Sequence, residues 1–222
     1  MTSPTPPDIV LFDLDGTISD SSPGMLTGFR KVFDRFDMEQ PSDESIRRHF
    51  GPPLAVTWRE VYGMTDEQIV VGLEVYREYY HDVGMFENNL YDGVPELIKD
   101  LHGEGVTLST ATSKPEFSAS RIIEHFGLRE YFTFIGAADL AGTRDDKSAV
   151  IAHTLENLHA NCQTHSIAMM GDRRHDVEGA REHGIDTIGV LWGYGTADEL
   201  STAGAIALAE RPRDAGDLLL NR

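Results

Sequence analysis

Two aspartates, Asp13 and Asp15, are separated by one residue at the end of an apolar run, and Gly16 follows directly. The run Ile9–Phe12 reads as a short buried strand. Side chains alternate along a strand, so both aspartates point to one side, about 6.6 Å apart along it. Like charges so placed repel unless a cation or a shared proton lies between them. The pair therefore indicates a cation site or acid–base chemistry, although two turn residues, one of them a helix cap, would also explain it.

Two hydroxyl residues follow the next predicted strand, Val106 to Ala111. Thr112 stands where a strand-end hydroxyl would face the same crevice as Asp13. Ser113 has a structural explanation instead, because it lies at capping-box spacing from Glu116.

Charged residues also mark two later positions. Lys147 begins a predicted helix, where a cation opposes the helix dipole by roughly several tenths of a kcal/mol, so helix energetics do not explain it. Asp145 and Asp146 could simply neutralise it at the surface. Asp172 and Asp176 follow the predicted strand Ile167 to Met170, where a turn residue and a helix cap are the structural alternatives.

The apolar run followed by the string DLDGT resembles the first motif of the haloacid dehalogenase superfamily, most of whose members are magnesium-dependent phosphatases. The resemblance implies that Asp13 is the nucleophile and that Asp15 is the general acid and base. The segment around Thr112 resembles the second motif, whose hydroxyl binds the transferring phosphoryl group. Ser113 would contribute through its backbone, and the role of Lys114 stays open.

The two remaining motifs are also present in the expected order. Lys147 resembles the third-motif lysine, which pairs with the nucleophile and the phosphate. The string from Gly171 to Asp176 is similar to the fourth motif, in which Asp172 ligates the metal and Asp176 supports the site. The resemblance therefore implies one Mg2+ held by Asp13, the backbone carbonyl of Asp15, and Asp172. The closest likeness is to phosphoglycolate phosphatases and their bacterial 5'-nucleotidase-like relatives.

The elements that must position these residues form an α/β protein. From Asp92 onward strands alternate with helices, which predicts a parallel, Rossmann-like sheet with helices on both faces. Ligands of such sheets bind beyond the carboxyl ends of the strands, where the motif residues stand. Between the first strand and this region the pattern is helical. We therefore predict a core domain over residues 1–17 and 91–222 and an inserted helical cap over residues 18–90.

Composition limits the partners. The 222 residues include 37 acidic and 19 basic residues, giving a formal charge of −18, so nucleic acid and anionic membranes are poor partners. A small phosphate ester is the expected partner, provided that a local positive patch offsets this field. Candidates for that patch are Lys114, Lys147, Arg47 and Arg48. One cysteine, Cys162, and no signal-like or membrane-spanning segment predict a cytoplasmic protein.

The sequence also allows other interpretations to be compared with a phosphatase. His153, His159, Cys162 and His165 crowd together, but their spacing does not match a zinc site. A dehalogenase should lack the second acid of the first motif, so Asp15 argues against it. A phosphosugar mutase or a non-catalytic metal- or partner-binding module stays possible. The substrate and the oligomeric state cannot be read from the sequence.

Overall fold

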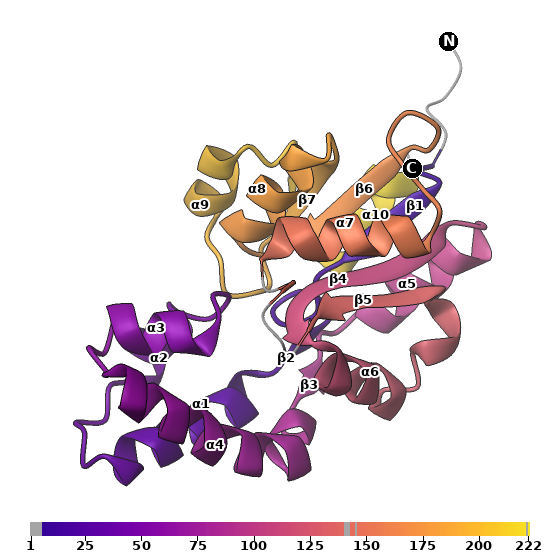
Figure 1. The fold of residues 1–222 in the computed structure, drawn as a ribbon. Coiled ribbons are helices and arrows are strands. Elements are labelled where there is room, and N and C mark those ends of the chain that lie inside the picture. Colours follow the sequence, from indigo (N-terminus) through magenta and orange to yellow (C-terminus); the bar gives the residue numbers. More distant parts are fainter. Residues whose placement is uncertain (1–5, 140–142, 145, 221) are drawn as a thin grey trace. The chain divides into compact units, whose positions relative to one another are not determined.

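The computed structural model describes residues 6–139, 143–144, 146–220 and 222 (Figure 1). The chain divides into two compact units, one formed by Met1–Ser19 with Leu90–Arg222 and the other by Asp20–Asn89. The first contains a six-stranded sheet and the second is helical. Two short strands, β2 (Ser19–Asp20) and β3 (Asn89–Leu90), pair where the chain passes from one unit to the other. That the helical unit acts as a cap stays a prediction.

The sheet has the strand order β5-β4-β1-β6-β7-β8, and its pairings are parallel. This confirms the predicted α/β class. β1 lies between β4 and β6, and all four of its residues are buried. The strands are β1 (Ile9–Phe12), β4 (Thr107–Pro115), β5 (Phe134–Ala138), β6 (Ile167–Gly171), β7 (Asp186–Val190) and β8 (Ala207–Ala209).

Helices cover both faces of this sheet (Figure 1). Ile9 and Leu11 of β1 pack against α7 and α8 in one apolar cluster with Val150 and Ala180, whereas α5 and α10 pack on each other over the opposite face. The helices of this unit are α5 (Val94–Gly103), α6 (Glu116–His125), α7 (Lys147–Asn157), α8 (Arg174–Glu182), α9 (Ala197–Ala203) and α10 (Pro212–Leu220). Short 3-10 turns lie at Arg129–Tyr131 and, in the helical unit, at Gly84–Phe86.

The helical unit is held together by aromatic side chains. Phe29 of α1 contacts Trp58 of α3 and Tyr76 of α4, with ring centroids 5.7 and 6.2 Å apart. Tyr80 stacks on Tyr76, and both are buried, so these rings belong to the core of the helical unit. Thr65 and Gln68 form a capping box at the start of α4. The helices are α1 (Ser22–Arg35), α2 (Asp43–Arg47), α3 (Leu54–Glu60) and α4 (Asp66–Asp82).

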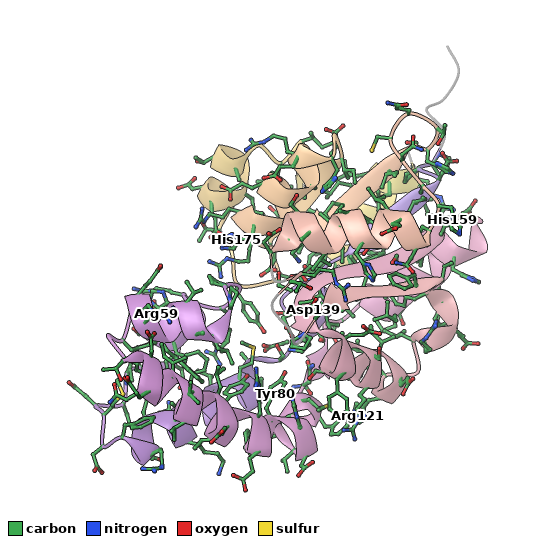
Figure 2. All side chains as sticks on the ribbon, viewed as in Figure 1. Arg59, Tyr80, Arg121, Asp139, His159 and His175 are labelled. Atoms are coloured by element: carbon green, nitrogen blue, oxygen red, sulfur yellow. The ribbon has the colours of Figure 1, made fainter. Side chains whose placement is uncertain are left out.

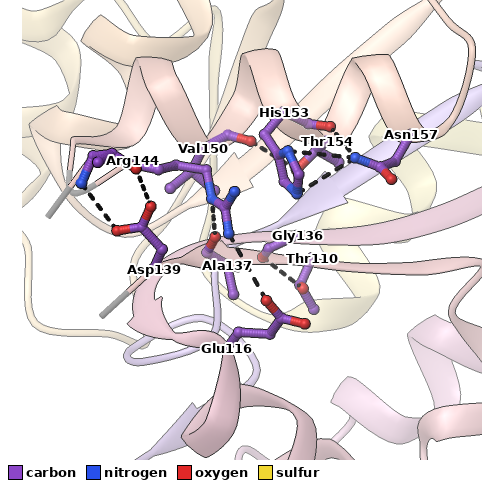
Figure 3. Close-up of polar contacts among 11 residues, drawn as sticks. Thr110, Glu116, Gly136, Ala137, Asp139, Arg144, Val150, His153, Thr154 and Asn157 are labelled. Carbon is purple, nitrogen blue, oxygen red and sulfur yellow. Dashed lines mark hydrogen bonds and ion pairs between the residues drawn. The ribbon is translucent and has the colours of Figure 1, made fainter. Parts of the chain in front are cut away.

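A glycine in β5 sets how closely α7 can approach the sheet. A Cβ atom on Gly136 would lie 1.9 Å from Thr154 Oγ1 and 2.4 Å from the Thr110 carbonyl oxygen. Thr110 Oγ1 donates to the Gly136 carbonyl oxygen at 2.9 Å, and Thr154 Oγ1 donates to the Val150 carbonyl oxygen at 2.8 Å (Figure 3). The site for an extra methyl group is therefore filled by buried, hydrogen-bonded atoms.

We expect Gly136→Ala to lower the free energy of unfolding by about 1–3 kcal/mol, because overpacking must displace backbone as well as side chain. Gly103→Ala is the matched control, since no atom lies within 4 Å of a Cβ atom there. Urea unfolding of the two variants beside the wild type measures the difference. Equal midpoints for all three proteins would show that the β5–α7 contact is not tight.

Candidate active site

Lys147 is buried between two carboxylates and a carbonyl group. Its Nζ atom donates to Asp13 Oδ1 and to the Ala111 carbonyl oxygen, each at 2.8 Å, and lies 2.8 Å from Asp176 Oδ1. An ammonium group has three hydrogens, so three acceptors satisfy it fully. The side chain of Lys147 is only 5% exposed, which makes these partners necessary.

Main-chain contacts fix the two ends of this ion pair. The Asp13 amide donates to the Met170 carbonyl oxygen at 2.9 Å, which extends the pairing of β1 with β6 up to the carboxylate. Asp146 caps α7 by accepting from the Ala149 amide at 2.7 Å. Asp146 thus has a structural role, and Asp145 lies outside the described residues. Helix α8 approaches Lys147 so closely that a Cβ atom on Gly179 would lie 2.9 Å from it.

Asp172 completes a cluster of three carboxylates. Oxygen atoms of Asp13, Asp172 and Asp176 lie within 4.8 Å of one another, the one group of potential metal ligands found in the described part of the chain. Asp172 is fully buried, and its Oδ1 has no hydrogen-bond partner among the described residues. A buried carboxylate oxygen with no donor is costly. A divalent cation would satisfy it, so the residues present fit a metal with oxygen ligands.

The charges of this cluster shift its acid–base properties. Burial raises the pKa of Asp13 to about 6, and the nearby Asp176 acts in the same direction. Burial also raises the pKa of Asp172 well above its usual range, helped by Asp176 and Asp13. Burial alone would lower the pKa of Lys147, but attraction to Asp13 and Asp176 outweighs it and the pKa is raised. Lys147 is therefore a permanent cation.

Asp176 contacts both the start of α8 and Lys147. Helix α8 begins at Arg174, so Asp176 is its third residue and does not precede the helix as the predicted cap would; its Oδ2 accepts from the amide of the N-cap residue Arg173 at 3.0 Å. Its Oδ1 faces Lys147. A Cβ atom on Gly171 would lie 2.3 Å from the Asp176 carboxylate, so the strand end must be glycine for this side chain to turn inward.

Asp15 is held by a second lysine. Lys114 Nζ lies 2.7 Å from Asp15 Oδ2, and the Lys114 side chain is 6% exposed. The Lys114 amide in turn donates to Thr112 Oγ1 at 3.2 Å. Asp15 Oδ1 is buried without a hydrogen-bond partner in the described structure. The sequence named Lys114 only as a candidate for the positive patch, and the structure places it against Asp15, the predicted general acid and base.

The structural explanation for Ser113 is wrong. Strand β4 continues to Pro115, four residues beyond the predicted end, and α6 begins at Glu116 with Pro115 as its N-cap and no side-chain cap. Ser113 therefore lies inside an extended strand, where it cannot cap the helix. The register of the pairing between β4 and β5 shifts between Thr112 and Pro115, so Ser113 and Lys114 lie in an irregular part of the strand.

Arg144 contacts the end of β5, Asp139 and Glu116 (Figure 3). Its Nε donates to the Ala137 carbonyl oxygen at 2.8 Å, and its carbonyl oxygen accepts from the Asp139 amide at 3.2 Å. A guanidinium nitrogen lies 3.8 Å from Glu116 Oε2. The sequence did not single out Arg144, because a surface loop arginine carries no motif signal.

The other candidate clusters do not form sites. The His153 ring packs on Phe134 with centroids 5.7 Å apart and lies beside Asn157 (Figure 3). His159 is exposed beyond the end of α7 (Figure 2), and Cys162 is also exposed. Arg47 and Arg48 are exposed on the helical unit, where Arg48 pairs with Glu44. Across the described residues, no helix combines the length and apolarity that a membrane span requires.

Comparison with known proteins identifies the class to which this fold and these motifs belong. Residues 10–190 match the family described as haloacid dehalogenase-like hydrolase. The chain belongs to the haloacid dehalogenase-like hydrolase family, as its motifs indicated.

Individual relatives agree with this membership. The chain is 41% identical to the tyrosine-protein kinase PtkA of Mycobacterium tuberculosis over 193 residues, which cover 86% of this chain and 65% of that protein. It therefore spans less than two thirds of that relative. It is 36% identical to a 5'-nucleotidase of Pseudomonas aeruginosa over 191 residues, 86% of each chain. The structure of a predicted phosphatase from Clostridium acetobutylicum superposes with a TM-score of 0.92 at 35% identity, covering 98% of this chain and all of that one.

The predicted likeness to phosphoglycolate phosphatases is confirmed, with a lower sequence identity than for the 5'-nucleotidase. The enzyme of that name from Vibrio parahaemolyticus is 23% identical over 203 residues, which cover 88% of each chain. The chain is thus more similar to the Pseudomonas aeruginosa 5'-nucleotidase than to this phosphoglycolate phosphatase.

The raised pKa of Asp13 predicts how stability depends on pH without metal. Between about pH 4 and 6 the folded protein binds a proton at Asp13 that the unfolded chain has released. This contribution to the free energy of unfolding is therefore lost as the pH rises through that window. Thermal unfolding in a chelator should show a steeper fall for the wild type than for Asp13→Asn.

Added divalent cation should reverse the trend, because protons and metal compete for the same oxygens. We expect the cation to raise the melting temperature more at pH 7.5 than at pH 5. An equal rise at both pH values would contradict metal binding at these carboxylates.

Proposed function

We propose that this protein is a Mg2+-dependent phosphomonoesterase that works through an aspartyl-phosphate on Asp13. The observation that supports it most is the buried cluster of Lys147 with Asp13 and Asp176, closed by Asp172. A nucleophilic carboxylate, a fixed cation and free carboxylate oxygens for a metal are the parts that phosphoryl transfer needs. Membership in the hydrolase family makes this chemistry the first choice.

The mechanism begins with attack by an Asp13 carboxylate oxygen on phosphorus. The new O–P bond forms as the bond to the leaving alcohol breaks, and Asp15 gives the alcohol its proton. A water then attacks the phosphorus of the aspartyl-phosphate, Asp15 takes the proton of that water, and inorganic phosphate leaves with Asp13 restored. Lys114 holds Asp15 Oδ2, so Oδ1 is the oxygen that carries the proton.

Three groups act on the phosphoryl oxygens in this proposal. Lys147 supplies a permanent positive charge beside Asp13. The hydroxyl of Thr112 accepts from the Lys114 amide, so its own hydrogen is available to a phosphoryl oxygen, and Ser113 contributes its backbone. Asp13, Asp172 and the Asp15 carbonyl oxygen would hold Mg2+, which would neutralise charge on the phosphoryl group.

The substrate that we propose is a small phosphorylated metabolite, with a nucleoside monophosphate favoured over phosphoglycolate. The chain is more similar to the 5'-nucleotidase than to the phosphoglycolate phosphatase. A charge of −18 disfavours a polymeric polyanion, so a monomeric ester is the consistent choice. We further propose that the protein acts in the cytoplasm and that the helical unit determines specificity.

Phosphate release from nucleoside monophosphates, phosphoglycolate and sugar phosphates, with Mg2+ and with a chelator, tests the proposal. We expect Mg2+-dependent release that Asp13→Asn lowers by at least about 10³-fold, because the nucleophile is lost. Asp186→Asn is the control, since this exposed aspartate lies at the amino end of β7, whereas the motif residues lie at the carboxyl ends of their strands. Unchanged release by Asp13→Asn would favour a binding module, and isomerisation of a hexose phosphate faster than release would favour a mutase.

Asp15→Asn separates the two halves of the reaction. A nitrophenolate leaves without a proton, whereas an alkoxide does not, so the first step should slow by about 10²–10⁴-fold only for alkyl esters. With nitrophenyl phosphate the phosphorylated protein should accumulate, because no base remains for hydrolysis. Mass spectrometry of the acid-quenched protein would find the phosphoryl group on Asp13. Equal losses for both esters without accumulation would remove Asp15 from the acid–base role.

A further inference from the structure

The loop after β7 lies directly on Asp172. The Tyr194 amide donates to Asp172 Oδ2 at 2.7 Å. The other oxygen, Oδ1, is left without a partner in the described residues, although the side chain is fully buried. One oxygen of this carboxylate is thus hydrogen-bonded to the loop, and the other has no partner among the described residues.

Two glycines allow this approach because of the space they leave. A Cβ atom on Gly193 would lie 2.2 Å from the Gly16 carbonyl oxygen and 2.5 Å from Asp172 Cβ. A Cβ atom on Gly195 would lie 1.8 Å from the Asp172 carbonyl oxygen. These atoms are backbone or buried side chain, so neither position accepts a larger residue without movement of the loop.

Both ends of the loop are anchored near the site. On one side, Trp192 Nε1 donates to the Thr17 carbonyl oxygen at 2.9 Å, next to the turn that follows Asp15. On the other side, Glu199 Oε1 accepts from the Arg174 amide at 3.0 Å and from Arg173 Nε at 2.9 Å. The loop therefore spans from the first motif to the start of α8, with Asp172 beneath it.

We propose that Gly193-Tyr194-Gly195 positions Asp172 so that it offers a single oxygen to a divalent cation, and that this loop favours Mg2+ over Ca2+. The inference rests on the proposed metal site. Mg2+ requires near-octahedral geometry with ligands that each give one oxygen, whereas Ca2+ accepts carboxylates through both oxygens and tolerates more ligands. The Tyr194 amide, together with the backbone of Gly16 and Gly193 packed close to Oδ2, disfavours a second contact of Ca2+ through that oxygen.

Titration calorimetry with Mg2+ and with Ca2+, without substrate, tests this directly. Tyr194→Pro removes the amide hydrogen, whereas Tyr194→Ala keeps it and changes only the side chain. We expect Tyr194→Pro to raise the Kd for Mg2+ by about tenfold or more, the usual size of an effect from a group that orients a ligand. The Kd for Ca2+ should rise less, so the preference for Mg2+ falls. Tyr194→Ala should keep the wild-type preference.

Glu199→Gln is a second variant that does not touch the loop backbone and should fold normally. It weakens the anchor to Arg173, and we expect a smaller loss of Mg2+ affinity in the same direction. Gly195→Ala should behave as Tyr194→Pro does, with Gly103→Ala unchanged as its control. In a Trp58→Phe background the fluorescence of Trp192, then the one tryptophan of the sequence, reports Mg2+ binding independently of activity.

The outcomes separate the two proposals. Folded Tyr194→Pro and Glu199→Gln proteins with the wild-type ratio of Mg2+ to Ca2+ affinity would overturn this inference and leave the phosphatase proposal intact. A wild-type protein that binds Mg2+ with the expected loop dependence but hydrolyses no phosphate ester would overturn only the proposed function. A wild-type protein that binds neither cation would overturn both.

Discussion

The site depends on one electrostatic constraint, which is the burial of three carboxylates beside a single ammonium group. When Asp13, Asp172 and Asp176 are ionised and Lys147 is charged, three negative charges face one positive charge, which leaves a net charge of −2. Such an imbalance is unfavourable in a dry interior. The protein alone relieves it by retaining protons, as the raised pKa values of Asp13 and Asp172 indicate. A divalent cation would neutralise it completely.

The sheet makes this crowding possible. β1 lies between β4 and β6, so residues at the carboxyl ends of these three parallel strands lie side by side. Asp13 follows β1, Thr112 lies near the end of β4, and Asp172 follows β6. Lys147 reaches these strand ends from the first turn of α7. A cation there opposes the dipole of its own helix, and two carboxylates hold it in place. The unfavourable interaction of Lys147 with the dipole of α7 is thus offset by the carboxylates of Asp13 and Asp176.

The order of strands and helices and the main charged residues could be predicted because their signals are local. An apolar run, a string of acids and a glycine turn are visible in a single segment. Three features could not be predicted in this way. The contact between Lys114 and Asp15 joins residues 99 positions apart, and Arg144 acts through a carbonyl oxygen that any sequence supplies. The extension of β4 through Ser113 depends on pairing with β5, which overrode a local capping pattern.

Strand β8 and the role of the glycines around Asp172 were also not predicted from the sequence. Strand β8 consists of Ala207, Leu208 and Ala209, which carry little intrinsic preference for a strand, and its position follows from pairing with β7. The glycines around Asp172 have meaning only once the distances to that side chain are known. Sequence patterns locate the reactive groups, whereas the residues that orient them can be identified only from their contacts in the structure.

The central claim is that Asp13 and Asp172 hold one divalent cation in the buried cluster. Its most direct test is anomalous diffraction from crystals grown with Mn2+ as a substitute for Mg2+. The account predicts one strong peak about 2.0–2.2 Å from an Asp13 carboxylate oxygen and from Asp172 Oδ1, with Oδ2 still bound to the Tyr194 amide. A peak elsewhere, or a Lys147 ammonium that still pairs with Asp13 while no ion lies in the cluster at saturating Mn2+, would contradict it.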